Sequence, residues 1–191
     1  IPASKLDIGL LASEWLAGHT EQSGMARFLM EKLGDLQTPQ AIEPRDVVLY
    51  GFGRIGRLAA RELIKQAGKG QQLRLRAIVT RGSSDADIIK RASLLRNDSV
   101  HGAFKGSVIE DLANKSLIIN GQIVHMIDAA NPEDIDYTAY GIHNALIIDN
   151  TGVFTNREAL SRHMQAKGVG KVLLTAPGKE IPNVVYGINQ D

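Results

Sequence analysis

The sequence predicts an α/β chain with a doubly wound, mainly parallel sheet, a small antiparallel hairpin excursion and an N-terminal helical extension. Short apolar runs rich in strand-forming residues alternate with segments whose apolar residues repeat at helical spacing. Asn120-Gly121 lies between two of these runs and is the strongest short-range signal for a type I′ hairpin. With 191 residues, 43% of them hydrophobic, the chain can bury the core of one moderate domain with an extra element.

A glycine fingerprint at residues 51–56 organises the rest of the chain. It joins a compact apolar run at residues 46–50, predicted to be a buried strand, to a segment with helical periodicity. Gly51 allows the tight bend out of the strand, Gly53 leaves room for a pyrophosphate beside the backbone, and Gly56 lets helix and strand approach closely. Free amides at the helix start favour an anion there. The stretch therefore predicts a Rossmann-type fold that binds a dinucleotide; the alternative is an ordinary glycine-rich turn.

The remaining elements follow from the same periodicities, with turn residues between them. Strands are expected at 73–80, 145–149, 171–177 and 184–187, with short strands within 106–127. Helices are expected at 85–95 and after Asn156, which is expected to cap the second of them. A helical turn is expected from residue 131 towards 140. Composition predicts a loop at 97–104.

The end of the second predicted strand lacks the acidic residue that favours NAD. A dinucleotide fold that prefers NAD usually places Asp or Glu there, against the adenosine ribose hydroxyls. This chain has Thr80-Arg81-Gly82-Ser83-Ser84 instead. A carboxylate would repel a 2′-phosphate, whereas Arg81 with neighbouring hydroxyls would attract one. We therefore expect NADP, or use of both cofactors, over strict use of NAD; the alternative is that Arg81 simply faces solvent.

A further turn is expected on the same edge of the sheet. In an open parallel sheet, ligands bind beyond the carboxyl ends of the strands. Asn150, Thr151 and Gly152 directly follow the apolar run at 145–149. We expect these residues to share one cofactor site with the fingerprint.

Composition excludes several kinds of site and partner. The chain has no cysteine, so it can supply no disulfide, thiol nucleophile or thiolate metal site, and its five histidines lack the spacing of metal ligands. A net charge of +1 gives no reason to expect nucleic-acid binding, and no apolar run is long enough to span a bilayer. We expect a cytoplasmic protein with no metal, no nucleic-acid partner and no membrane partner. Because the chain begins with Ile1 rather than methionine, we also expect it to be a piece of a longer protein.

Residues 1–44 are predicted to be an N-terminal helical extension, and residues 45–191 the nucleotide-binding domain. One helical stripe of apolar residues runs from Ile8 to Leu16, and a second runs from Met25 to Leu36 with Thr20 placed to cap its helix. We expect two short helices that pack on the domain; the alternative is a segment that docks a partner.

Five ordered stretches resemble the N-terminal part of the phosphorylating glyceraldehyde-3-phosphate dehydrogenases. The likeness covers about residues 46–190. The matching stretches are GFGRIGR at 51–57, NDSVHGAF at 97–104, LIING at 117–121, NTGVF at 150–154 and TAP at 175–177. The resemblance implies that the amides of Arg54 and Ile55 meet the pyrophosphate, that Thr151 and Gly152 line the adenosine and ribose side, and that Thr175 flanks the nicotinamide.

The chain departs from the family pattern at several positions. The family's acidic residue after the second strand aligns with Thr80, which agrees with the charge argument above. Its Glu-Arg pair near the adenine corresponds to Ala129-Ala130, so we expect a looser pocket edge, and the asparagine before the first fingerprint glycine corresponds to Tyr50. The N-terminal helices are absent from the ordinary family member, which suggests a longer variant.

On this resemblance, the complete enzyme oxidises a small phosphorylated aldehyde through a cysteine thiolate, passes hydride to NAD or NADP and releases the acyl group to inorganic phosphate. It is expected to be a homotetramer. The family's catalytic groups fall beyond Asp191, so we expect the catalytic domain and every catalytic residue to be absent from this chain, which alone would be inactive. Two alternatives stay open: a dehydrogenase of another phosphorylated aldehyde such as erythrose 4-phosphate, and a non-catalytic nucleotide-binding regulatory module.

Overall fold

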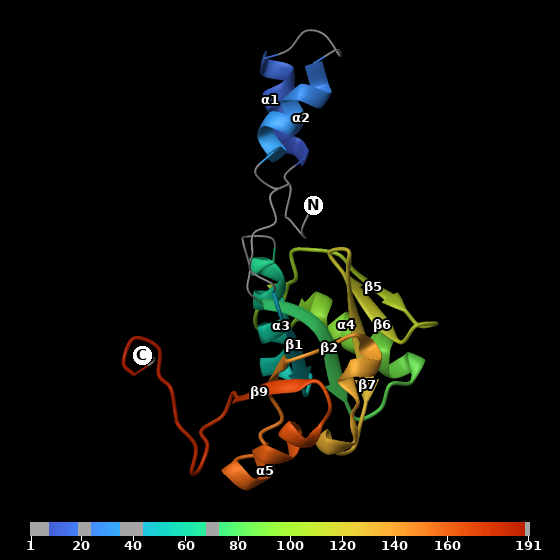
Figure 1. Cartoon of the computed structure of the whole chain (residues 1–191). Coiled ribbons are helices and arrows are strands. Elements are labelled where there is room, and N and C mark those ends of the chain that lie inside the picture. Colours follow the sequence, from blue (N-terminus) through green and yellow to red (C-terminus); the bar gives the residue numbers. More distant parts are fainter. Residues whose placement is uncertain (1–7, 19–23, 35–43, 68–72, 190–191) are drawn as a thin grey trace. The chain divides into compact units, whose positions relative to one another are not determined.

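A computed structural model of the chain describes residues 8–18, 24–34, 44–67 and 73–189 (Figure 1). The chain divides into two compact units, which are described separately. The first comprises residues 1–44 and 66–72, and the second comprises residues 45–65 and 73–191.

The first unit contains two short helices, α1 (Ile8–Gly18) and α2 (Met25–Leu33), as the sequence predicts. Trp15 and Phe28 pack against each other with their ring centres 5.3 Å apart, and both are buried. Most other members of the predicted apolar stripes are exposed: Ile8, Leu16, Met25 and Leu29. An ion pair between Lys32 Nζ and Glu14 Oε2 at 2.8 Å also joins the two helices, while the exposed apolar residues stay outside these contacts.

Three predictions about this unit are not tested. Thr20, the expected cap, and Leu36, the end of the second stripe, lie outside the described residues. Packing of the helices on the nucleotide-binding domain, or their use in docking a partner, stays a prediction.

The second unit is built on a seven-stranded sheet in the order β5-β6-β7-β2-β1-β8-β9. Strands β7, β2, β1, β8 and β9 are parallel, whereas β5 and β6 are antiparallel to their neighbours. This confirms the doubly wound, mainly parallel sheet with an antiparallel excursion. The strands are β1 (Arg45–Tyr50), β2 (Leu73–Thr80), β5 (Val108–Asp111), β6 (Ser116–Ile119), β7 (Gln122–Asp128), β8 (Ala145–Asp149) and β9 (Val169–Leu174).

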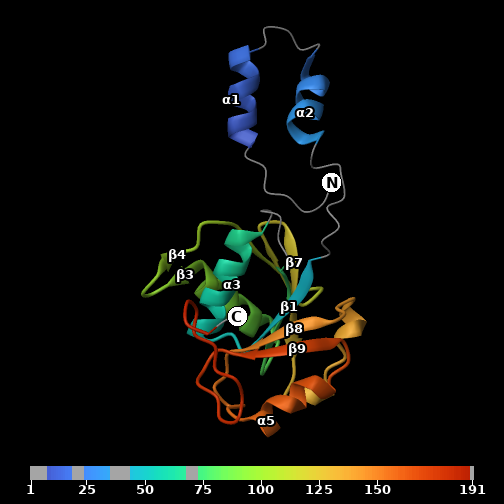
Figure 2. The same cartoon turned by 60° about the vertical axis from the view of Figure 1, so that its left-hand side comes forward.

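Helices cover both faces of the sheet. α3 (Arg54–Gln66) and α4 (Asp85–Arg96) pack on one face. The other face is covered by η3 (Pro132–Asp134), η4 (Tyr137–Tyr140), α5 (Arg157–Ser161) and η5 (Arg162–Gln165). Figure 2 shows α3 and α5 on opposite sides of β1, β8 and β9. None of the helices in the described part of the chain is long and apolar enough to cross a membrane.

Strand β1 is buried because both faces of the sheet are covered. Val47 and Leu49 belong to the core under α3 and α4, while Val48 and Tyr50 belong to the core under η4 and α5. This alternation follows from the two-residue period of a strand. Each fully buried aliphatic side chain contributes roughly 2 kcal/mol of hydrophobic stabilisation. The strand therefore holds the turn at its carboxyl end firmly in the middle of the sheet.

Two local predictions from turn chemistry are confirmed. Asn120 and Gly121 have φ values of 48° and 81°, the positive pair that a type I′ turn requires between β6 and β7. Asn156 caps α5, since its side-chain oxygen accepts a hydrogen bond from the Ala159 amide at 2.8 Å.

The loop predicted at 97–104 is wrong in part. Its ends pair as a small antiparallel ladder of β3 (Asn97–Asp98) and β4 (Gly102–Ala103). The buried carboxylate of Asp98 accepts hydrogen bonds from the amides of Val100 and His101 at 3.0 Å and from Arg57 Nη2 at 3.2 Å. Composition indicated a loop because the segment is rich in turn-forming residues, and it could not reveal that Arg57 of helix α3 bonds Asp98.

The strand predicted at 184–187 is also wrong. The segment is a turn, in which Val185 donates its amide to Asn189 Oδ1 at 2.6 Å and the Ile188 amide donates to the Val185 carbonyl at 3.0 Å. Val184, Val185 and Tyr186 are exposed. Within residues 73–189 no neighbouring strand offers this segment a ladder, so its β propensity is not realised.

We expect the hydrogen-bonded Asp98 carboxylate to make a pH-dependent contribution to the stability of the fold. Hydrogen bonds from the His101 backbone and side chain, from Val100 and from Arg57 hold the pKa of the Asp98 carboxyl well below its ordinary value of 3.8. The ionised form therefore stabilises the fold fully above that ordinary pKa, and the contribution is lost as the pH falls towards the depressed value.

Asp98→Asn should consequently lower the midpoint of urea unfolding clearly at about pH 7, and the gap from the unsubstituted chain should narrow towards about pH 3. A gap that stays constant across this range would show that the carboxylate charge is not what stabilises the ladder.

Candidate functional site

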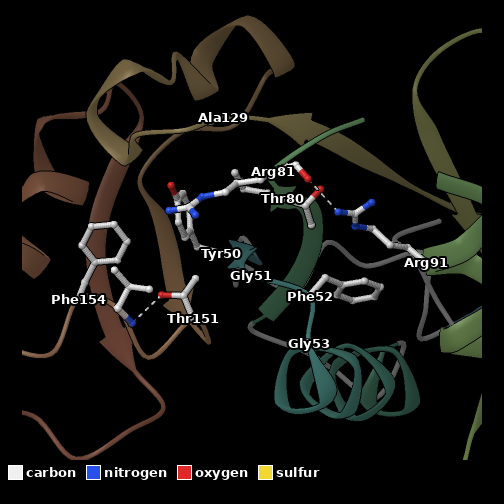
Figure 3. Close-up of a pocket in the computed structure, with 12 residues that line it drawn as sticks. Tyr50, Gly51, Phe52, Gly53, Thr80, Arg81, Arg91, Ala129, Thr151 and Phe154 are labelled. Carbon is white, nitrogen blue, oxygen red and sulfur yellow. Dashed lines mark hydrogen bonds between the residues drawn. The ribbon is translucent and has the colours of Figure 1, made fainter. Parts of the chain in front are cut away.

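The candidate site lies where the strand order reverses between β1 and β8. The chain leaves β1 towards β2 on one side and later returns to β8 on the other, and ligands of doubly wound folds bind at such a reversal. A cavity of about 380 Å³ opens there (Figure 3). It is lined by Tyr50, Gly51, Phe52, Gly53, Val79, Thr80, Arg81, Arg91, Ala129, Thr151, Val153 and Phe154.

The fingerprint glycines give this turn its shape. Gly51 has a φ of 90°, and its amide donates to the Val79 carbonyl at 2.9 Å. A Cβ on Gly56 would lie 2.4 Å from the Gly51 carbonyl oxygen, so the helix start and the turn touch backbone to backbone. A Cβ on Gly53 would meet no atom within 4 Å. Gly53 therefore borders open space, whereas Gly51 and Gly56 are required for the close approach.

The N-terminus of α3 offers free backbone donors at the cavity. The first four amides of a helix have no partner within it. Arg57 is the first residue of α3 whose amide has an acceptor among the described residues, the Gly53 carbonyl at 3.0 Å. The amides of Arg54 and Ile55 precede it, and both residues are exposed. Together with the helix dipole, these amides favour an anion.

The turn after β2 is fixed by several hydrogen bonds. Thr80 Oγ1 donates to the Gly82 carbonyl at 3.1 Å, and the Gly82 amide donates to Asp128 Oδ1 at 2.7 Å. The Ser84 hydroxyl donates to Asp87 at 2.6 Å and accepts from the Asp87 amide at 3.2 Å. Ser84 is thus the cap of α4, and its hydroxyl is already engaged. This weakens its predicted part in holding a phosphate.

Arg81 and Arg91 both line the cavity. The exposed Arg81 side chain points across the cavity towards Tyr50 (Figure 3). Arg91 Nη2 donates to the Arg81 carbonyl at 3.0 Å, and Arg91 Nη1 pairs with Asp87 at 3.2 Å. The Arg81 guanidinium therefore lies on the Tyr50 side of the cavity, whereas the Arg91 guanidinium stays at the turn after β2.

The sequence did not reveal that Arg91 and Asp128 lie beside the turn after β2. No motif or spacing in the sequence relates Arg91 to the turn that it reaches. Asp128 ends β7 and is the register partner of Thr80, so it places a carboxylate beside the turn that carries no acidic residue of its own. Knowledge of the strand order was needed to find it.

The apolar wall of the cavity comes from Tyr50, Val153, Phe154 and Ala129. The Tyr50 and Phe154 rings meet edge to face, with centres 5.9 Å apart. Burial, and secondly the charge of Asp149, raise the pKa of the Tyr50 hydroxyl above its ordinary value, whereas the nearby Arg81 opposes the shift. An apolar slot beside free amides suits a base joined to a phosphate group.

The cavity brings together five of the predicted site residues: Gly51, Gly53, Thr80, Arg81 and Thr151. The other six lie around it without lining it: Arg54, Ile55, Gly56, Asn150, Gly152 and Thr175. Their predicted roles in holding a cofactor stay predictions.

The turns after β8 and β9 show what two of those six residues do in the fold. The Asn150 amide donates to the Tyr50 carbonyl at 2.8 Å, and its side-chain Nδ2 donates to the Ile148 carbonyl at 3.0 Å. Thr175 donates its amide and its hydroxyl to the Asp149 carbonyl, both at 3.0 Å. Both residues therefore hold strand ends in register beside the cavity. Across the described residues, no group of three His, Cys, Asp or Glu side chains could hold a metal ion.

Comparison with known proteins relates this geometry to a family. The family model described as glyceraldehyde 3-phosphate dehydrogenase, NAD binding domain, matches residues 45–157. A glyceraldehyde-3-phosphate dehydrogenase-like protein of Pseudomonas aeruginosa strain UCBPP-PA14 is 47% identical over 98% of this chain and 41% of its own length. The glyceraldehyde-3-phosphate dehydrogenase of P. aeruginosa strain PAO1 is 37% identical over 76% of this chain and 41% of its own length. The chloroplastic glyceraldehyde-3-phosphate dehydrogenase A of Zea mays is 37% identical over 76% of this chain and 34% of its own length.

These matches differ in how much of the chain they cover. This chain spans about two fifths of the length of the first relatives that it matches. The match to the UCBPP-PA14 protein covers nearly the whole chain, including most of the segment before residue 45, whereas the other two leave about a quarter of it uncovered. The chain belongs to the glyceraldehyde-3-phosphate dehydrogenase family, and residues 45–157 match the NAD-binding domain of that family.

Proposed function

We propose that this chain is the dinucleotide-binding part of a phosphorylating glyceraldehyde-3-phosphate dehydrogenase. The observation that carries the proposal is the cavity at the strand reversal, where the open turn at Gly53 and the free amides of α3 adjoin an apolar slot. These features suit the pyrophosphate and a base of one dinucleotide. Family membership supports the reaction class.

The residues of this chain bind and orient the cofactor in the proposed reaction. The nicotinamide of NAD or NADP, when bound, accepts a hydride from the aldehyde carbon. The amides of Arg54 and Ile55 would hold the pyrophosphate, and the rings of Tyr50 and Phe154 would exclude water from one wall. Attack on the aldehyde needs a nucleophile such as a thiolate, and this chain has no cysteine. We therefore propose that the catalytic groups belong to polypeptide outside this chain, and that the chain alone is inactive.

The other proposed partners are a small phosphorylated aldehyde, inorganic phosphate and further copies of the full-length protein in a cytoplasmic homotetramer. With inorganic phosphate present, the full-length protein should reduce NAD or NADP on addition of glyceraldehyde 3-phosphate, measured by the absorbance of the reduced nicotinamide. This chain alone should show no reduction. Faster reduction with erythrose 4-phosphate would assign that substrate instead. Dinucleotide binding without reduction by either aldehyde would favour the non-catalytic regulatory module.

The charges at the turn after β2 support the proposal that the chain binds NADP at least as tightly as NAD. No described residue pairs with the Arg81 guanidinium, which borders the cavity. Arg91 already pairs with Asp87, and Asp128 adds a further carboxylate at the turn. Because these two carboxylates would oppose a 2′-phosphate, the proposed preference rests mainly on Arg81.

Arg81→Ala should weaken NADP binding on the order of tenfold, since a charge-assisted hydrogen bond contributes about 1.5–3 kcal/mol. NAD binding should change little, because NAD lacks the 2′-phosphate. Isothermal titration calorimetry of this chain with each dinucleotide measures both affinities. Lys90→Ala is the matched control, because Lys90 is an exposed cation of α4 that does not line the cavity. An NADP affinity unchanged by Arg81→Ala would remove Arg81 from the site.

Gly53→Val should abolish dinucleotide binding and leave the fold intact. A Cβ built on Gly53 meets no protein atom within 4 Å, so the added side chain should extend into the space proposed for the pyrophosphate. Circular dichroism and thermal unfolding check the fold, and calorimetry checks binding. Gly53→Ala, with a smaller side chain, should give an intermediate affinity. Full affinity in the valine variant would show that the pyrophosphate lies elsewhere.

A further inference from the structure

A buried carboxylate and a buried imidazole meet behind the cavity. Asp149 is the last residue of β8, and His163 lies in η5, within the crossover that connects β8 to β9. Asp149 Oδ2 and His163 Nε2 are 2.9 Å apart, and the two side chains are 0% and 1% exposed. A buried polar pair of this kind is costly unless its hydrogen bonds are complete. The pair therefore fixes the distance between η5 and the carboxyl end of β8.

The second carboxylate oxygen of Asp149 holds the next turn of the chain. Asp149 Oδ1 accepts hydrogen bonds from the Thr151 amide at 2.8 Å and from Thr151 Oγ1 at 2.7 Å. Thr151 Oγ1 in turn accepts from the Val153 amide at 3.1 Å. One side chain thus organises three consecutive polar contacts in the turn. Thr151 itself is exposed and lines the cavity, although the group that holds it is buried.

The surroundings of His163 determine the direction of its hydrogen bond. The ring meets Tyr50 edge to face at 4.6 Å and Phe154 at 5.1 Å, and both of these rings also line the cavity. Its Nδ1 atom is buried without a hydrogen-bond partner among the described residues. An ionised carboxylate can only accept hydrogen bonds, so His163 Nε2 is the donor to Asp149. His163 is therefore a fixed donor rather than a group free to bind ligand.

A displacement of Thr151 would change its contact with Gly51 of the glycine fingerprint. A Cβ built on Gly51 would lie 2.8 Å from Thr151 Cγ2 and 3.3 Å from the Thr151 amide nitrogen. The turn after β8 therefore packs directly on the turn after β1. If the imidazole is lost, the Asp149 carboxylate stays buried with one hydrogen-bond partner missing. Rotation of the Asp149 side chain towards solvent would then pull the Thr151 turn away from the cavity wall.

We infer that Asp149 and His163 are positioning residues for the dinucleotide site, acting through Thr151. The inference rests on the proposed function, because it concerns affinity for the same ligand. Neither residue touches the cavity itself, so neither is a catalytic residue. The pair holds the Thr151 turn in its binding position before the ligand arrives. The binding free energy is therefore not reduced by the free energy needed to order this turn.

The first experiment separates positioning from general stability. His163→Phe keeps an aromatic ring but removes the donor, and it should weaken NAD binding on the order of tenfold, the cost of ordering one or two side chains on binding. His163→Gln, which retains an N–H donor, should recover part of the loss. Arg74→Gln is the matched control. It removes the partner of the buried Asp46 carboxylate, bonded at 2.7 Å, at the opposite end of the sheet from the cavity.

Calorimetry at a temperature where every variant is folded gives the affinities, and urea unfolding gives the stabilities. The inference expects Arg74→Gln to lose stability without losing affinity, and His163→Phe to lose both. If His163→Phe loses stability only, the pair is structural and the inference is overturned. If the unsubstituted chain does not bind NAD or NADP, the proposed function fails instead.

A double-mutant cycle tests whether the effect passes through Thr151. Thr151→Val removes the hydroxyl that bonds Asp149 and keeps the side-chain volume. If His163 acts through this turn, the affinity loss of the double variant should be smaller than the product of the two single losses. Independent, multiplicative losses would overturn the proposed route.

Hydrogen exchange on the unsubstituted chain provides a test that needs no variant to fold. The Thr151 amide belongs to an exposed residue, yet its bond to Asp149 should slow its exchange in the absence of ligand. Exchange at the rate of an unprotected amide would show that the turn is not held, and the inference would fall.

Discussion

The site depends on the close approach of three backbone segments at the carboxyl end of β1. Gly56 touches the Gly51 carbonyl, and Gly51 in turn touches Thr151, with no room for a side chain at either glycine. Gly51 also adopts a φ of 90°, a conformation that other residues rarely take. Because these contacts bring helix α3 directly to the edge of the sheet, its unpaired amides lie beside the cavity. The anion-binding geometry is a consequence of packing rather than of any charged side chain.

Burial on both faces of the sheet makes these contacts durable. The residues of β1 alternate between two hydrophobic cores, so the strand cannot shift without exposing one of them. The last residues of these strands, Tyr50, Thr80 and Asp149, are also buried, and hydrogen bonds join the strand ends to one another. The Gly51 amide bonds the Val79 carbonyl, and the Asn150 amide bonds the Tyr50 carbonyl. The ends of β2, β1 and β8 are thereby tied side by side, and they form the rim on which a ligand would rest.

The sequence was most informative where structure follows from neighbours along the chain. The glycine turn, the Asn120-Gly121 hairpin and the Asn156 cap are local, and all three predicted features occur in the structure. The missed side-chain contacts involve partners far apart in sequence: Arg57 of α3 bonds Asp98, and the buried pair behind the cavity joins residues in β8 and η5. The ladder at 97–104 is different, because its paired residues lie only four and six positions apart. The segment at 184–187 has strand-forming residues but no strand beside it within residues 73–189.

The balance of charge at the β2 edge shows why a motif alone does not decide between NAD and NADP. The resemblance aligns the family's acidic residue with Thr80. The register partner of Thr80 is Asp128, so the neighbouring strand supplies a carboxylate to this turn. Asp87 partly neutralises Arg91 in the same way. Arg81 has no such partner among the described residues. The potential felt by a 2′-phosphate is therefore the difference between one unpaired guanidinium and one nearby carboxylate, both exposed and both screened by water and salt. This balance of charge is the basis of the proposal that both cofactors are accepted.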